Sequence, residues 1–103
     1  MKEPNIKKIE EIALGIKQLA VQAVQQYSLE VDLIISSECK DDKRIEHILE
    51  GMLDFCFDET MLLWYKKLCR YYFTFNPVTT AYHINAYREM WDTESSEIET
   101  EKS

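Results

Sequence analysis

The scarcity of turn-forming residues most constrains what this chain can fold into. Its 103 residues contain only two glycines, Gly15 and Gly51, and two prolines, Pro4 and Pro77. Hairpin turns depend on glycine and proline at fixed positions, so the chain encodes few of the turns that an antiparallel sheet needs. The scarcity therefore favours helices joined by short connections.

The first predicted element is one long amphipathic helix. Apolar residues recur there at alternating steps of three and four, which is the period of a helix with one buried face. They are Ile6, Ile9, Ala13, Ile16, Ala20, Ala23 and Tyr27, with Ile12 and Leu19 widening the stripe. Asn5 is the predicted N-cap. Gly15 lies inside the helix, where glycine costs about 1 kcal/mol relative to alanine, so it either permits a close helix approach or is tolerated.

The segment that follows fits two interpretations. The helical repeat fails at residues 28–30, and residues 29–35 alternate in the period of a half-buried strand. Val31 and Ile34 would equally continue a helical face. A strand would need a partner, for which residues 71–75 are the β-like candidate. We favour the helix and keep α+β, with one short two-stranded pairing of 29–35 and 71–75, as the alternative.

Three more helices are predicted after the polar loop 36–42. Their N-caps are Asp41 or Asp42, Asp58, and Asn76, which precedes Pro77 at the first helical position. The second helix has an apolar face on one side only. The third, residues 59–73, is apolar around most of its circumference, which is typical of a helix at the centre of a bundle.

The predicted fold is therefore all-α, an irregular four-helix bundle in a single domain of residues 1–92. From Asp92 onward the chain has five acids, one base and several serines and threonines, a composition that cannot bury enough apolar surface to fold. We expect residues 93–103 to form a disordered acidic tail. Residues 92–103 carry −4 of the net charge of −7, so the acidity says little about the partner of the bundle.

The composition also bears on location. The sequence has no run of about 18 apolar residues, the length that a membrane-spanning helix needs. Its three cysteines, Cys39, Cys56 and Cys69, include no C-x-x-C pair, and an odd count suits reduced thiols. Cys56 and Cys69 lie on apolar runs and are expected in the core. We expect a cytoplasmic protein that does not insert into membranes.

No motif predicts catalysis. The sequence lacks a phosphate-binding glycine loop, G-x-S-x-G and H-E-x-x-H. The acids near His47 (Glu46, Glu50 and Asp54) share one helix, but a di-metal bundle needs Glu-x-x-His on two helices, so we interpret them as a solvated face. We expect a non-enzymatic protein with no catalytic residue, metal or cofactor.

Aromatic and basic residues interleave between Trp64 and Trp91. The rings either form the bundle core, with tyrosine hydroxyls reaching the surface, or form a binding surface, where tyrosine and tryptophan are enriched. The partner-binding candidates are Trp64, Tyr65, Tyr71, Tyr72, Tyr82, Tyr87 and Trp91. The predicted function is a protein-interaction module that self-associates as a homodimer through these rings on helices 59–73 and 77–91.

Two alternatives remain. After Asn76, polar residues are followed by apolar ones in a pattern similar to that of the recognition helix in a helix-turn-helix. This pattern predicts a nucleic-acid-binding accessory or regulatory protein. Its candidate residues are Lys66, Lys67, Arg70, Thr79, Thr80, His83 and Arg88, with His83 expected at the surface. Bulky rings stand where that motif usually has a small residue and a glycine. The net charge motivates the second alternative, an acidic inhibitor of another protein.

Overall fold

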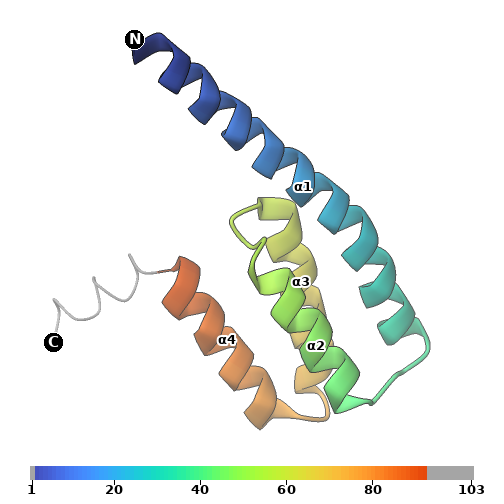
Figure 1. Ribbon diagram of the computed structural model, residues 1–103. Coiled ribbons are helices and arrows are strands. Elements are labelled where there is room, and N and C mark those ends of the chain that lie inside the picture. The colour runs from blue at the N-terminus through green and yellow to red at the C-terminus, as the bar shows by residue number, and fades with distance from the viewer. Residues whose placement is uncertain (1, 93–103) are drawn as a thin grey trace, which may run out of the picture.

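The computed structural model describes the backbone of residues 2–92 and the side chains of residues 7–92. They form four helices, α1 (Lys2–Ser36), α2 (Asp42–Leu53), α3 (Glu59–Phe73) and α4 (Pro77–Trp91) (Figure 1). Within these residues there is no strand, so the all-α prediction is confirmed. The predicted acidic tail, residues 93–103, lies outside the described residues.

Helix α1 is continuous through the segment that fitted two interpretations. The helical interpretation of 29–35 is confirmed, and the alternative pairing of 29–35 with 71–75 is wrong, since residues 71–73 belong to α3. Val31 and Ile34 are fully buried, so the apolar face continues across the polar residues. The Ser28 hydroxyl donates to the carbonyl of Gln25, which accommodates this residue inside the helix. The helix also begins at Lys2, so Asn5 is not its N-cap.

The other three helices begin where their caps predict. Asp41 accepts from the backbone N–H groups of Lys43 and Arg44, Asp58 from that of Met61, and Asn76 from that of Thr79. Each contact satisfies a donor that the first helical turn leaves without a partner. Pro77 follows its cap at the start of α4, as predicted.

The helices pack so that α2 and α3 separate α1 from α4. Helix α3 contacts all three others, whereas within residues 2–92 α1 and α4 do not contact each other. The core is formed by Val31, Ile34, Ile45, Ile48, Leu49, Met52, Cys56, Met61, Tyr65, Leu68, Cys69 and Tyr72. Residues 59–73 are apolar around most of the helix, and the central position of α3 agrees with the prediction made from that pattern.

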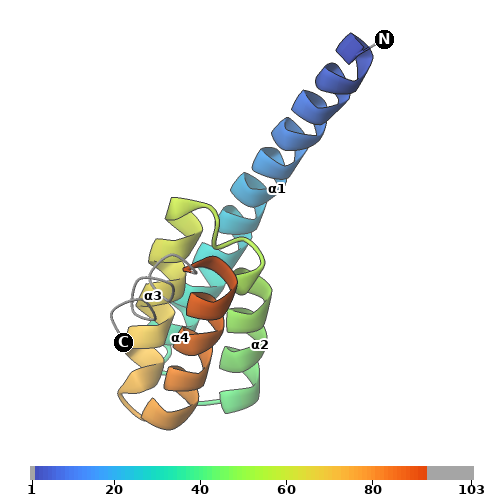
Figure 2. The same cartoon turned by 90° about the vertical axis from the view of Figure 1, so that its left-hand side faces the viewer.

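The N-terminal half of α1 extends beyond the bundle, as both views show (Figures 1 and 2). Helix α1 has 35 residues and the others 12 to 15. At 1.5 Å per residue, it is about 52 Å long against about 18 to 22 Å for its neighbours. Burial begins at Ala20, which is fully covered. We call residues 7–19, which precede it, the α1 overhang.

The turn after α1 places a non-glycine residue in the left-handed region. Glu38 has φ 54°, and the Cys39 N–H donates to the carbonyl of Ile34 at 2.9 Å, as in a Schellman helix end. Glycine adopts this conformation without the Cβ clash. We expect Glu38→Gly to raise the free energy of unfolding by about 1 kcal/mol, measured by urea denaturation. Glu38→Ala keeps the Cβ and should give no such gain; an equal gain from both would contradict the explanation.

A polar junction joins α2, α3 and α4 at one end of the bundle. The Tyr72 hydroxyl donates to Asp42 Oδ1 at 2.8 Å, and the Asn76 side-chain amide donates to the same oxygen at 3.0 Å. Hydrogen bonds from Asn76, and next from Tyr72, lower the pKa of the Asp42 carboxyl. The charged carboxylate therefore favours the folded state.

The lowered pKa predicts how stability changes with acidity. A carboxyl with a lower pKa in the folded state stabilises the protein above its unfolded-state pKa, and this stabilisation is lost as the pH falls through the folded pKa. We expect stability to fall below about pH 4, with a smaller fall for Asp42→Asn. Urea denaturation at pH 6 and pH 3 measures both slopes. Equal slopes would show that other carboxyls account for acid unfolding.

Candidate functional site

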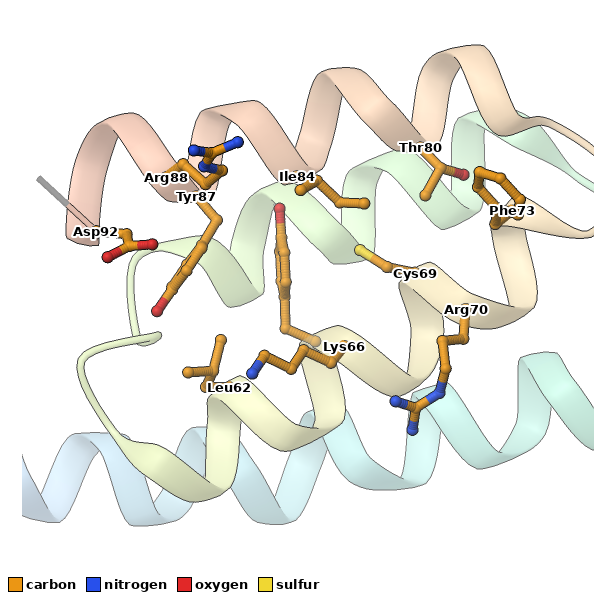
Figure 3. A pocket seen from close by; sticks show the side chains of 11 residues that line it. Leu62, Lys66, Cys69, Arg70, Phe73, Thr80, Ile84, Tyr87, Arg88 and Asp92 are labelled. Atoms are coloured by element: carbon orange, nitrogen blue, oxygen red, sulfur yellow. The ribbon is translucent and has the colours of Figure 1, made fainter. Parts of the chain in front are cut away.

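A groove runs between α3 and α4, with a volume of about 530 Å³ (Figure 3). Helix α3 lines it with side chains spaced by about one turn, and α4 faces them in the same manner. The lining residues are Leu62, Tyr65, Lys66, Cys69, Arg70 and Phe73 from α3, and Thr80, Ile84, Tyr87, Arg88 and Asp92 from α4 and its end.

The floor of the groove is mainly apolar, and the hydroxyl groups of Tyr65 and Thr80 donate hydrogen bonds to backbone carbonyls. Tyr65 is buried and its hydroxyl donates to the backbone carbonyl of His83 at 2.7 Å, which links α3 to α4. Burial raises the pKa of the Tyr65 phenol. The rings of Tyr65 and Tyr87 lie 6.2 Å apart, and Ile84 remains 41 % exposed. An incoming apolar side chain can therefore be buried against these residues.

Basic side chains stand on both walls. Lys66 and Arg70 are exposed on α3, and Arg88 is half-buried on α4 (Figure 3). Within the described part of the chain, Lys66 and Arg70 form no salt bridge. Asp92 is the one acid among the lining residues. The groove thus combines an apolar floor with a basic rim.

The aromatic residues predicted to bind a partner do not form one surface. Tyr65 and Tyr72 are core residues, so their prediction as contact residues is wrong; both lie on parts of α3 that pack against the other helices. Trp64, Tyr71 and Tyr87 are half-buried. Tyr82 is 67 % exposed, and Trp91, 38 % exposed, donates its indole N–H to the carbonyl of Leu53 at 2.7 Å.

The residues predicted to bind nucleic acid are also divided. His83 and Thr80 are buried, so the expectation of a surface histidine is wrong and neither side chain can reach a DNA groove. Both point toward the bundle because this face of α4 packs on α2 and α3. The Thr80 hydroxyl donates to the Asn76 carbonyl, and His83 Nε2 lies 3.7 Å from Glu46 Oε1 with no hydrogen-bond partner.

The remaining nucleic-acid candidates lie in different places. Lys67 is directed away from the groove, 3.5 Å from Asp32 of α1 and 4.8 Å from the centre of the Trp64 ring. Thr79 is half-buried beside the cap of α4. The structure therefore brings only Lys66, Arg70 and Arg88 of the basic set to one site.

Sequence reasoning missed the apolar lining residues Leu62, Phe73 and Ile84. A signal for them exists, because Leu62, Lys66, Arg70 and Phe73 follow one another at steps of four, four and three, which places them on one helix face. The apolar and basic members were assigned to separate patterns, and their common face was overlooked.

The thiols differ in access. Cys56 and Cys69 are buried, as predicted, and burial raises the pKa of each to about 12. At pH 8 this lowers their thiolate fraction about a thousandfold relative to an ordinary thiol, so we expect iodoacetamide to modify only half-buried Cys39 in the folded chain. Mass spectrometry should count one label per folded chain and three per chain in urea. Rapid labelling of all three in the folded chain would contradict this burial.

Two further findings concern the described residues. They contain no group of three histidine, cysteine, aspartate or glutamate side chains placed to hold a metal ion. None of their helices has the length and apolar character needed to cross a bilayer. Comparison with protein-family models, with curated proteins and with solved structures found no match for this chain.

Proposed function

We propose that this chain is a non-enzymatic protein-interaction module whose α3–α4 groove binds an acidic amphipathic helix of another protein. The observation that carries the proposal is the combination of an apolar floor with basic side chains on both walls of one groove. Amphipathic helices bind in such grooves through apolar side chains at steps of three and four, with charged residues meeting the rim.

The dimensions of the groove fit a short helix. Leu62 and Phe73 mark its ends on α3 and are eleven residues apart, which is about 16 Å. A helix of about three turns covers this length and offers three apolar side chains on one face. Exposed Phe73 and Ile84 are suited to receive them.

The charges favour a partner other than a second copy of the described helices. Lys66 and Arg70 would attract acids on the incoming helix, and complementary charge raises the rate and specificity of association. The α1 overhang has three lysines and two glutamates, so it is not an acidic ligand. A cytoplasmic location is part of the proposal, because all three cysteines are free thiols.

Two synthetic peptides can test the groove by fluorescence anisotropy. The first is a labelled helix with leucines at i, i+3 and i+7 flanked by glutamates, and the second replaces each glutamate with lysine. We expect the full chain to bind the first peptide only, more weakly as salt screens the rim. Lys66→Glu/Arg70→Glu should weaken binding by about tenfold or more.

The matched control is Lys43→Glu/Arg44→Glu, which makes the same change of charge on exposed residues outside the groove. It should change affinity by less than about twofold. Equal binding of both peptides, or equal losses in the two double variants, would contradict the proposal. Duplex DNA serves as a competitor: binding of DNA that only Lys66→Glu/Arg70→Glu abolishes would favour the nucleic-acid alternative.

A further inference from the structure

The chain leaves the bundle at one end of the α3–α4 groove. Asp92, which follows the last residue of α4, is itself one of the residues that line this groove (Figure 3). After Asp92 the sequence continues through residues 93–103, the acidic tail, which contains four glutamates and one lysine. An acidic segment is therefore attached to the chain at the entrance of a groove whose rim is basic.

We propose that the acidic tail folds back over the groove of its own chain and competes there with the partner helix. This inference rests on the proposed function, because it describes the regulation of the same groove. The glutamates of the tail meet Lys66 and Arg70, which are exposed and are the side chains that attract the acids of the partner. A partner then binds only by displacing the tail.

The tail is long enough to reach the basic rim. Leu62 marks the end of the groove on α3 near Asp92, so the tail must cross to the other wall and advance by four residues of helix to meet Lys66 (Figure 3). Packed helices lie about 8 to 10 Å apart, and four residues of helix are about 6 Å long, which gives a combined distance of about 10 to 12 Å. The extended chain from Asp92 to Glu97 spans up to about 16 Å.

The spacing of the glutamates matches the spacing of the basic residues. In an extended chain Glu97 and Glu99 direct their side chains to the same side, about 6.6 Å apart. Lys66 and Arg70 are separated by about 6 Å along α3. A tail that enters from Asp92 runs in the same direction as α3, so Glu97 lies beside Lys66 and Glu99 beside Arg70.

The residue between the two glutamates suits the floor of the groove. Ile98 is the one large apolar residue in the sequence of the acidic tail. In an extended chain its side chain is directed to the side opposite its neighbours, so glutamates at the rim place Ile98 over the floor. Ile84 is 41 % exposed there, at a level between Lys66 and Arg70 (Figure 3). The tail thus offers the apolar and acidic groups that the groove can bind.

A weak contact is sufficient because the tail is tethered. A short tether gives an effective concentration in the millimolar range, so a contact with a dissociation constant of about the same size or below closes most of the grooves. The apparent affinity of a partner falls by a factor of one plus the ratio of closed to open chains. A ratio of about 2 to 9 therefore weakens the partner by about three- to tenfold.

Fluorescence anisotropy with the peptide of leucines and glutamates described above tests the competition. The variant is Glu97→Gln/Glu99→Gln/Glu101→Gln, which removes the three acids that share one side of an extended tail. In the full chain it should bind the peptide about three- to tenfold more tightly than the parent. An affinity equal to that of the parent would overturn the competition.

The matched control is Glu10→Gln/Glu11→Gln/Glu50→Gln. It makes the same change of net charge at exposed residues outside the groove, so it measures the general effect of charge on an acidic peptide. The expected change in affinity is less than about twofold. A gain as large as that of the tail variant would show that net charge, and not the tail, sets the affinity.

Carbodiimide cross-linking of the parent chain tests the contact without a partner. The reagent joins a lysine amine to a carboxylate that lies against it, and mass spectrometry locates the new amide. We expect Lys66 to be joined to Glu97 or Glu99 within single chains, in a yield that does not depend on protein concentration. Its neighbour Lys67 is directed away from the groove and lies 3.5 Å from Asp32, so it should be joined to Asp32 and verifies the reaction.

The outcomes separate this inference from the proposed function. A Lys67 bond without a Lys66 bond to the tail, or a Lys66 bond that forms only between two chains, would overturn the folded-back tail. Peptide binding that is equal in the parent and the tail variant would then leave the proposed function standing. A Lys66 bond to the tail with no peptide binding by any variant would instead keep the contact and overturn the proposed function.

Discussion

Leu68→Ala is expected to lower the free energy of unfolding by about 2 to 5 kcal/mol. Leu68 is fully buried on α3, which like α2 contacts the three other helices, so the removed methyl groups leave a cavity that few side chains can fill. Urea denaturation followed by circular dichroism measures the loss. Leu63→Ala makes the same chemical change on α3 at a residue that is 65 % exposed, and should stay within about 0.5 kcal/mol of the parent. Similar losses in the two variants would contradict the central position of α3.

Tyr72→Phe is expected to lower the free energy of unfolding by about 1.5 to 3 kcal/mol. The ring remains in the core, but the hydroxyl that donates to Asp42 Oδ1 is lost, together with its contact to the Asn76 amide at 3.3 Å. Burial and the bond to Asp42 raise the pKa of this phenol, so it remains a donor across the working range of the protein. Chemical denaturation at pH 6 gives the loss.

The control for this variant is Tyr82→Phe, which removes the hydroxyl of a ring that is 67 % exposed. Its effect should be within about 0.5 kcal/mol. The effect of Tyr72→Phe should shrink as the pH falls through the lowered pKa of Asp42, because the carboxylate that accepts the hydrogen bond is then lost. An effect that stays constant throughout the acid titration of the folded protein would show that the hydroxyl acts through another partner.

The parts of the fold that could be predicted are those determined by short-range chemistry. Asp41, Asp58 and Asn76 act as caps through contacts within three residues, so the sequence contains all the necessary information. The central position of α3 followed from the shape of its apolar surface. Both properties can be predicted without knowing which helices pack against each other.

The features that could not be predicted depend on packing between helices. Residues 28–30 break the apolar stripe, so 29–35 also fitted a strand, yet burial of Val31 and Ile34 by other helices outweighs that local pattern. The α1 overhang was not predicted, because the apolar stripe continues along α1 and does not show how far the neighbouring helices extend beside it.

The candidate site could be predicted only in part. Lys66 and Arg70 were identified from charge, but the burial of Thr80 and His83 depends on how α4 is rotated against α2. Helix α4 has apolar and polar residues on most of its faces, so its sequence does not specify that rotation. The core positions of Tyr65 and Tyr72 follow from tertiary hydroxyl contacts with His83 and Asp42, which lie 18 and 30 residues away.

The continuity of α1 has a consequence for amide hydrogen exchange. In α1 the α1 overhang, which does not pack on the bundle, continues without a break into a segment that is buried in the core. The frequency with which backbone hydrogen bonds open should therefore increase steadily from Ala20 toward Lys7. Amides near Ile34 should exchange only when the whole bundle unfolds, whereas those near Ile12 should exchange by local fraying.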